Sequence, residues 1–279
     1  MIDKPAGPTS HDVVARVRRA LGTRAVGHTG TLDPFATGLL VVMVGRATRL
    51  ARFVEQQPKT YLATVRLGRR TTTDDPTGEP LGEDADPSGL GEDTIRDALA
   101  RRVGPQEQRP PAYSAKRVAG ARSYHLARKG IAVDLPPVPV TVHQLRLVAY
   151  RPPELVVRAR VSPGTYLRAL ARDLGEDLGV GAHLVALRRE AVGELRVDGA
   201  IPLDRLRPDT PLLPPQAVLR HLPAREIDAE ARRAVAHGRP LPGAAEPEGP
   251  VVLMNEGDLV AVAMAEGGWL KPAVVLERT

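Results

Sequence analysis

The spacing of apolar residues predicts helices in several parts of the chain. Between residues 9 and 22, apolar positions recur three and four residues apart, as they do along one face of an amphipathic helix. Thr9 or Ser10 is the expected N-cap, and Gly22 is the expected end. The same reasoning predicts helices over residues 9–22, 47–56, 93–104 and 164–179.

Strands are predicted where apolar residues alternate with polar residues or form a short continuous run. Residues 39–45 (LLVVMVG) form such a run, which is typical of a strand buried on both faces. In residues 59–68 (KTYLATVRLG) every second residue, Tyr61 among them, is apolar. Further strands are predicted over residues 138–150, 154–162 and 183–195. Because helices and strands do not alternate regularly, the predicted fold class is α+β.

The chain is predicted to contain two domains. Proline-rich residues 207–227 separate the elements above from residues 249–276, where three short apolar runs are divided by glycine turns. That pattern is typical of a small antiparallel barrel. A length of 279 residues also exceeds that of one typical domain. We therefore predict a large domain over residues 1–222 and a small domain over residues 223–279.

The charged residues indicate a polyanionic partner. The net charge is +6, and only five of the 39 basic residues are lysines, so arginine dominates. Arginine is suited to bidentate contacts with phosphate groups. Residues 71–93 are acidic and rich in proline and glycine, which predicts an exposed loop. Residues 109–130 are basic and predict a projecting element.

The sequence contains no motif for a cofactor, a metal or a membrane span. It has no cysteine, which excludes disulfides, thiolate nucleophiles and cysteine-ligated metals. It also has no P-loop, no dinucleotide fingerprint after a strand, no G-x-S-x-G elbow and no histidine pair at metal-ligand spacing. No run of about 18 apolar residues occurs, and charges at Asp3 and Lys4 interrupt the start. We therefore expect a cytoplasmic protein without a metal or cofactor.

Residues 27–34 (GHTGTLDP) place Asp33 in a glycine-flanked loop. Pro34 favours an extended conformation at Asp33, while Gly27 and Gly30 allow a tight turn or a close approach to a ligand. Taken alone, the motif favours a turn aspartate that accepts hydrogen bonds from backbone amides. The alternative is a carboxylate held in one position for chemistry.

Five segments together resemble the TruB family of tRNA pseudouridine synthases. They occur in the family's order and cover most of residues 1–200: DKPAGPTSHDVV, GHTGTLDPFATGLLVVMVGRATR, KTYLATVRLGRRTTTDDPTG, PPAYSAKRVAGARSYHLARKG and SPGTYLRALARDLGEDLGVGAHLVALRREAVG. The resemblance implies a pseudouridine synthase fold, with a central mixed, mainly antiparallel sheet flanked by helices. The C-terminal residues more faintly resemble a small PUA-like RNA-binding barrel.

The resemblance implies that uridine-55 in the T-loop of tRNA is isomerised to pseudouridine. The N-glycosidic bond breaks, the uracil rotates, and C5 is joined to the sugar, so no cofactor is needed. Asp33 matches the family's nucleophile, and Arg168 matches the arginine that pairs with it. Tyr61 matches a tyrosine that packs against the uracil and takes part in proton transfer. Which carbon the carboxylate attacks stays open.

Four further residues match family positions around the substrate. Tyr166 and Leu187 match residues that line the uracil pocket, and His28 matches a histidine that fills the space left when bases leave the loop. Lys4 matches a lysine near the active site that supports the Asp33 loop. Local patterns alone assign Tyr166 and Leu187 to the core, and a lone histidine such as His28 is more often a structural hydrogen-bonding residue.

The implied partner is the T-stem-loop of tRNA. A basic insertion at about residues 105–135, and within it Arg109 to Lys129, matches a family element that grips this stem-loop through phosphates and RNA shape. No protein partner is implied, and a monomer is the default. Two alternatives remain: a tRNA-binding or folding factor in which catalysis is secondary, and a pseudouridine synthase that acts on another RNA.

Two features depart from the family pattern. Members usually have several residues before the Asp3-Lys4-Pro5 motif, so either the first strand is short here or the natural start lies upstream. Pro163 also stands where other residue types are usual, although the Gly-Thr-Tyr that follows is intact. Neither departure affects Asp33.

Overall fold

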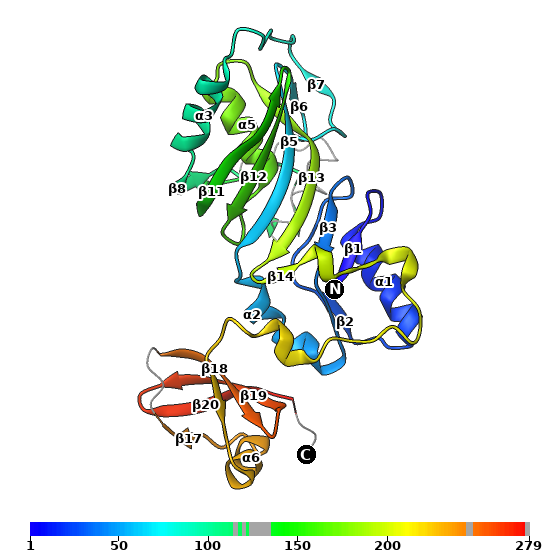
Figure 1. Cartoon of the computed structure of the whole chain (residues 1–279), viewed down its shortest axis with the longest axis vertical. Helices are drawn as coiled ribbons and strands as arrows, with labels where there is room; N and C mark the ends of the chain where they lie inside the picture. The colour runs from blue at the N-terminus through cyan, green and yellow to red at the C-terminus, as the bar shows by residue number, and fades with distance from the viewer. Residues whose placement is uncertain (114–116, 119–120, 123–134, 244–247, 277–279) are drawn as a thin grey trace.

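A large mixed sheet with helices on one face forms the upper part of the molecule, and a smaller C-terminal sheet lies below it (Figure 1). The computed structural model describes residues 1–113, 117–118, 121–122, 135–243 and 248–276. Helices and strands are mixed along the chain, and the central sheet has both parallel and antiparallel pairs. The predicted α+β class is therefore confirmed.

Nine strands of the described residues form the large sheet, in the order β15-β1-β3-β13-β5-β12-β11-β8, with β14 paired to β13. The pairs β1 with β15 and β3 with β13 are parallel, and the other neighbours are antiparallel. The strands are β1 (Ile2–Lys4), β3 (Thr37–Leu40), β5 (Lys59–Leu67), β8 (Gly104–Gln108), β11 (Val138–Arg151), β12 (Glu154–Val161), β13 (Ala182–Val192), β14 (Leu195–Arg196) and β15 (Ile201–Pro202).

Three of the four predicted helices, α1, α3 and α5, begin and end within three residues of the predicted positions, whereas the predicted helix at 47–56 begins as a 3-10 turn and α6 is not predicted. Thr9, not Ser10, caps α1: its side chain accepts from the Asp12 amide, and the Asp12 side chain accepts from the Thr9 amide, while Gly22 ends the helix with φ 62°. No helix within the described ranges is long and apolar enough to cross a membrane. The helices are α1 (Ser10–Leu21), α2 (Ala51–Glu55), α3 (Glu92–Arg101), α5 (Leu167–Asp177) and α6 (Ala229–Ala236), with 3-10 turns η1 (Gly45–Leu50), η2 (Val197–Gly199), η3 (Leu203–Arg205) and η4 (Pro215–Val218).

Helices α3 and α5 cover one face of the large sheet (Figure 1). Along β5 buried and half-buried residues alternate, so Tyr61 and Ala63 face the helices. Leu170 and Leu174 of α5 pack into the same core cluster. Because successive strand residues point to opposite faces, the predicted alternation identifies the core face of β5 correctly.

The apolar run over residues 39–45 is not the single strand predicted from its sequence. It divides at Val41 into β3 and β4 (Val42–Val44), and β4 pairs with β2 (Val26–His28) in a separate two-stranded sheet. The amide of Thr29 donates to the Val41 carbonyl at 3.1 Å, at the point where the chain changes sheets. Residues on both sides of the break are apolar and suit a buried strand in either sheet, so the hydrophobic pattern does not indicate where the strand is broken.

The prediction that residues 71–93 form an exposed loop is wrong in its first part. Strands β6 (Arg70–Thr71) and β7 (Pro80–Leu81) form a hairpin, and within it Asp75 is only 5 % exposed. Neighbouring threonines donate hydrogen bonds to this carboxylate, and Arg168 forms an ion pair with it. Because its polar atoms are paired in this way, the carboxylate can be buried.

The C-terminal residues form a five-stranded sheet together with α6. The three predicted strands are β18 (Gly249–Asn255), β19 (Asp258–Glu266) and β20 (Trp269–Val275), and they are joined by β16 (Ala224–Glu226) and β17 (Leu241–Pro242). Side chains of η1 and α2 contact the edge of this sheet: Arg46, Arg49 and Arg52 donate to the carbonyls of Leu276, Val275 and Ala273 at 2.8, 2.6 and 3.4 Å.

Gly38 lies where β3 runs beside β13, and we expect Gly38→Ala to destabilise the protein by about 3 kcal/mol. Its φ is 101°, which strains other residues, and an added Cβ would lie 2.3 Å from the Arg189 carbonyl oxygen. Urea unfolding measures this change. Gly27→Ala is the matched control, because no atom lies within 4 Å of the point that its Cβ would occupy and its φ is not in the left-handed region. Equal stability of the two variants would contradict the prediction.

Candidate active site

A pocket of about 660 Å³ lies where the loop around Asp33, strands β5 and β13 and the start of α5 meet. It lies on the face of the large sheet that α5 covers. Five of the seven residues predicted for the site line it: Asp33, Tyr61, Tyr166, Arg168 and Leu187. The structure thus brings together residues that are up to 154 positions apart in the sequence.

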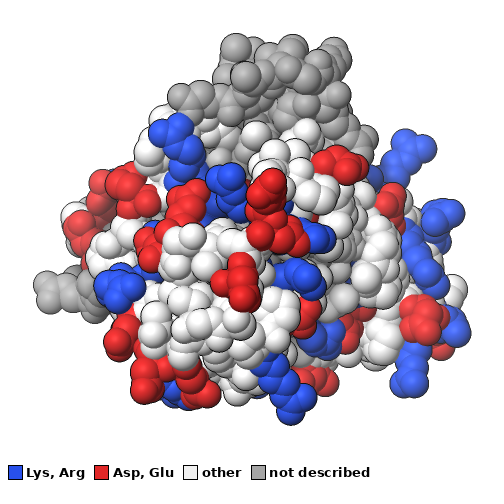
Figure 2. All heavy atoms as spheres, turned by 90° about the horizontal axis from the view of Figure 1, so that it is seen from above, with Lys and Arg blue, Asp and Glu red and all other residues white. Residues whose placement is uncertain are grey.

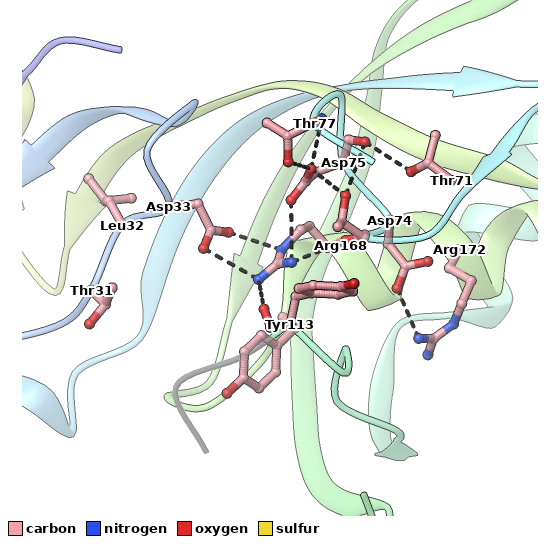
Figure 3. A network of polar contacts seen from close by, with 12 residues as sticks. Thr31, Leu32, Asp33, Thr71, Asp74, Asp75, Thr77, Tyr113, Arg168 and Arg172 are labelled. Carbon is pink, nitrogen blue, oxygen red and sulfur yellow. Dashed lines mark hydrogen bonds and ion pairs between the residues drawn. The ribbon is translucent and has the colours of Figure 1, made fainter. Parts of the chain in front are cut away.

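Asp33 and Arg168 form an ion pair at this pocket (Figure 3). Arg168 Nε lies 3.0 Å from Asp33 Oδ2, and Arg168 Nη2 donates to Oδ1 at 3.3 Å. The Arg168 side chain is 5 % exposed, whereas that of Asp33 is 32 % exposed. Arg168 also donates to the carbonyls of Thr73 and Tyr113, at 3.1 and 2.9 Å. The arginine is therefore fixed in the protein, and the carboxylate faces the pocket.

A second carboxylate, Asp75, binds the same arginine (Figure 3). Asp75 Oδ2 lies 3.3 Å from Arg168 Nη1. Its other oxygen accepts from the Thr73 hydroxyl at 2.6 Å, and from the hydroxyl and amide of Thr77 at 2.6 and 2.9 Å. Because Arg168 lies between two carboxylates, it is shared, and its charge does not fully neutralise Asp33.

Burial raises the pKa of the Asp33 carboxyl above its ordinary value. Arg168 opposes this increase in pKa, the nearby charge of Asp75 adds to it, and Lys4 has a smaller lowering effect. Catalytic carboxylates commonly lie partly buried in a pocket and have an elevated pKa. Arg168 therefore favours the ionised form of the carboxylate but does not offset the effect of burial on its pKa.

The loop that carries Asp33 is held from behind by buried polar side chains. The Ser10 hydroxyl accepts from the Leu32 amide at 2.9 Å and donates to the Leu32 carbonyl at 3.2 Å. Lys4 is fully buried and donates to the carbonyls of Pro5, Pro8 and Pro34, at 2.8, 2.9 and 3.3 Å. Burial lowers the pKa of Lys4 to about 8. Lys4 does not line the pocket, so it positions the loop and does not reach a ligand there.

Arg189 of β13 holds the other side of this loop. Its guanidinium donates to the carbonyls of Leu39, Gly30 and Thr31, at 2.7, 3.0 and 3.4 Å. The residue is 2 % exposed and lines the pocket. The strand register places it opposite Tyr61 and beside Gly38. Hydrogen bonds from one rigid strand to three carbonyls fix the course of the loop on either side of Asp33.

The aromatic and apolar wall of the pocket comes from β5, β13 and the residue that precedes α5. Tyr61 and Leu187 are each 7 % exposed. Tyr166 is the N-cap residue of α5, although the sequence pattern predicts it within the helix. The side chain of Gln108 accepts from the Tyr166 amide at 2.8 Å and donates to its carbonyl at 3.1 Å. These two bonds fix the backbone of Tyr166 beside the pocket.

His28 lies beside the pocket, not in its wall. Its ring packs edge to face against that of His11, with centroids 5.6 Å apart, and His11 lines the pocket. His28 Nδ1 accepts from the Gly30 amide at 3.3 Å, which leaves the ring proton on Nε2. Burial lowers the pKa of His28, and the nearby His11 and Arg189 lower it further.

The sequence patterns do not assign Asp75, Arg189, Ser10 or Gln108 to the site, although they indicate Ser10 as a possible N-cap. A signal for Arg189 is present: it lies two residues after Leu187 in a strand, so alternation places both on the same face. Asp75 lies inside the TTTDDPTG segment, but its acidic neighbours make the segment look exposed. Ser10 and Gln108 act through contacts with residues 22 and 58 positions away, for which local sequence gives no signal.

Most of the basic insertion lies outside the described residues, which omit 114–116, 119–120 and 123–134. Within it, two-residue strands β9 (Arg117–Val118) and β10 (Ala121–Arg122) pair with each other. Figure 2 shows acidic and basic side chains interspersed over the end of the molecule that carries α3. No group of three metal-ligating side chains occurs in the part of the chain that the structure describes.

Comparisons with known proteins support the resemblance noted in the sequence. The model of the TruB family pseudouridylate synthase N-terminal domain matches residues 18–167, and that of the tRNA pseudouridylate synthase B C-terminal domain matches residues 168–209. The tRNA pseudouridine synthase B of Thermobifida fusca is 46% identical, with 99% of this chain and 97% of that protein aligned. That of Mycobacterium tuberculosis is 42% identical, with 99% and 94% aligned.

Solved structures show the same fold. An H/ACA ribonucleoprotein bound to a substrate RNA containing 2′-deoxyuridine includes a chain that matches with a TM-score of 0.77 and 26% identity, over 99% of this chain and 84% of that one. The archaeal box H/ACA Nop10–Cbf5 complex gives a TM-score of 0.74 at 26% identity, with the same coverage. On these matches and the geometry of the pocket, the chain belongs to the TruB family of tRNA pseudouridine synthases.

Proposed function

We propose that this enzyme isomerises uridine-55 in the T-loop of tRNA, in the cytoplasm, with Asp33 as its nucleophile. The observation that carries the proposal is the Asp33–Arg168 ion pair, which opens into a pocket walled by Tyr61 and Leu187. A carboxylate can attack an electron-poor carbon and later leave, which divides one difficult step into two. The ion pair keeps the carboxylate ionised, and its exposed side faces the space where a base can bind.

The flipped uracil would lie between the aromatic side chains and Asp33. Enzymes that act on a stacked base first extrude it and then hold it in a pocket. Tyr61, Tyr166 and Leu187 supply flat or apolar contacts for the ring. His28, whose lowered pKa favours the neutral ring, would fill the space left in the RNA loop together with its neighbour His11. Asp33 then attacks C1′ of the sugar or the uracil ring, or assists elimination to a glycal.

The remaining parts of the proposal concern the arrangement of the chain. Residues 1–222 would form the catalytic domain, and residues 223–279 a PUA-like RNA-binding domain built on the five-stranded sheet. The basic insertion would grip the T-stem-loop, mainly through phosphates. The enzyme would act as a monomer without a protein partner. The alternative, a tRNA-binding or folding factor in which catalysis is secondary, uses the same surfaces but does not need the ion pair.

Release of tritium from C5 of the target uridine tests the proposal. Isomerisation joins C5 to the sugar and must expel its hydrogen, so T-loop RNA labelled at C5 of uridine-55 releases tritium on reaction. A second RNA, labelled only at other uridines, is the control for position. Tritium release from the second RNA but not from the first would contradict uridine-55 as the target. RNA binding with no release above a no-enzyme control would favour the binding factor.

The pH dependence of the reaction is expected to report the elevated pKa of Asp33. Only the ionised carboxylate is a nucleophile, so kcat/KM should fall as the pH falls through the pKa of Asp33. Burial raises that pKa, so the midpoint should lie above the ordinary aspartate value of about 3.9. Single-turnover tritium release measures the profile, and circular dichroism at each pH shows that the protein stays folded. A flat profile down to pH 4 would contradict this role.

A further inference from the structure

Two buried cations, Lys59 and Arg189, lie beside each other at the pocket, next to the Asp33 loop. Lys59 is 7 % exposed and Arg189 is 2 % exposed, and both line the pocket. Gly30 lies against both: a Cβ there would be 3.5 Å from Arg189 Nη1 and 3.8 Å from Lys59 Cε. The two side chains thus meet at one point of the pocket wall.

Neither cation is neutralised by a carboxylate among the described residues. Lys59 Nζ donates to the carbonyls of Glu55 and Gln57, at 2.6 and 2.8 Å, and Arg189 donates only to carbonyls. No described carboxylate oxygen lies within 4.0 Å of either group. The Glu55 carboxylate attracts Lys59 only from a greater distance. Burial of charges without counter-ions is costly, so two of them side by side indicate a site that an anion completes.

Both cations retain donors for a ligand. An ammonium has three N–H groups and a guanidinium has five. Toward the part of the chain that the structure describes, Lys59 uses two of its donors on carbonyls and Arg189 uses three. The unused donors belong to side chains in the pocket wall. Burial, and to a smaller extent the nearby charge of Arg189, lower the pKa of Lys59 to about 8, so an arriving anion would also favour the charged ammonium.

We propose that Lys59 and Arg189 form a phosphate subsite, which binds one of the two phosphates that flank the flipped target uridine. This inference rests on the proposed function, because it takes the uracil to lie beside Asp33 in the same pocket. A nucleotide in the pocket brings its own phosphates with it, and a phosphodiester carries one negative charge with two unesterified oxygens. Two adjacent cationic donors fit that group. The subsite would position the sugar of the target nucleotide relative to the Asp33 carboxylate.

Neutral phosphate analogues test the subsite on the wild-type enzyme. Each flanking phosphate of a T-arm RNA is replaced in turn by an uncharged methylphosphonate, as resolved stereoisomers, and the Kd is measured. At one position we expect binding to weaken by about tenfold, the effect of losing one charge-assisted hydrogen bond. Unchanged affinity at both positions would overturn the proposal. Tritium release from the unmodified RNA tests the proposed function separately, so failure of one does not imply failure of the other.

Variants then assign the effect to the subsite. Lys59→Met should bind unmodified RNA about tenfold more weakly and should lose its sensitivity to the methylphosphonate, whereas Lys59→Arg should retain it. Arg96→Met, which removes an exposed cation of α3 paired with Glu92, is the control and should respond to the methylphosphonate as the wild type does. Equal sensitivity of Lys59→Met and the wild type would overturn the assignment. If Lys59→Met does not fold, the methylphosphonate scan of the wild type still shows whether a flanking phosphate is bound. The Kd of Lys59→Arg for unmodified and methylphosphonate RNA then shows whether a cation at position 59 keeps that binding.

Discussion

Asp33→Asn is expected to lower kcat for tritium release by at least about 10⁴-fold, with little change in RNA affinity. Asparagine has the shape of aspartate but cannot act as the nucleophile, so only a step that needs the carboxylate is lost. On the proposed function, phosphates of the T-stem-loop contact the basic insertion and not Asp33, so these contacts are retained. Single-turnover tritium release measures the chemical step, and a filter-binding assay on the same RNA measures affinity.

The same substitution is not expected to destabilise the fold at neutral pH. Burial raises the pKa of Asp33, so the folded protein takes up this proton more readily than the unfolded chain. Ionised Asp33 therefore lowers stability above the pKa of an unfolded aspartate, and a neutral side chain removes that effect. The substitution also leaves Arg168 in a one-to-one pair with Asp75. The urea midpoint of Asp33→Asn should equal or exceed that of the wild type.

Asp74→Asn is the matched control for Asp33→Asn. Asp74 is also a partly buried aspartate paired with an arginine of α5, since Arg172 Nη1 lies 3.1 Å from Asp74 Oδ2. It does not line the pocket. We expect tritium release by this variant to stay within about tenfold of the wild type, because a partly exposed ion pair contributes little. Comparable losses in both variants would contradict the assignment of Asp33 as the nucleophile.

Arg168→Met is expected to reduce both activity and stability. The guanidinium donates to two backbone carbonyls and binds two carboxylates, and it is almost completely buried. Its loss leaves Asp75 buried without its cation, a change that costs about 3–5 kcal/mol. It also removes the group that keeps Asp33 ionised, so the acid limb of the pH profile should move to higher pH. Urea unfolding and tritium release measure the two effects.

A second substitution, added to Arg168→Met, distinguishes the loss of activity from the loss of stability. Asp75→Asn removes the carboxylate that Arg168→Met leaves unpaired, so the double variant should recover part of the stability but none of the activity. Arg172→Met is the control, because this arginine lies one turn further along α5 and its side chain is 20% exposed. Its replacement should lower the free energy of unfolding by about 1 kcal/mol. If the double variant recovered activity with stability, Arg168 would have only a structural role.

The sequence predicts regular elements well and their junctions poorly. The helix at Ser10–Leu21 follows from its apolar spacing and its caps, and the core face of β5 follows from alternation. The break at Val41 does not follow from the sequence, because both strands that meet there are apolar. Helix α6 does not follow either, because its surroundings are rich in proline and glycine, and the strands around it favour a purely β-structured barrel.

Residues of the candidate site can be predicted from the sequence only where they belong to a family motif. Asp33, Tyr61, Arg168 and Leu187 are identified by resemblance, and they do line one pocket. The residues that hold them in place depend on the tertiary structure. Asp75 meets Arg168 across 93 positions of sequence, and Arg189 meets Gly30 across 159. No local pattern distinguishes these charged residues from exposed ones.

The contact of η1 and α2 with the C-terminal sheet tolerates amino-acid substitution on the side of the sheet. Arg46, Arg49 and Arg52 donate to main-chain carbonyls of residues 273–276, and every residue type presents the same carbonyl group. Substitutions in that strand therefore leave the three acceptors in place as long as the backbone keeps its course. The C-terminal sheet can therefore diverge in its exposed side chains while these three hydrogen bonds to the rest of the enzyme are kept.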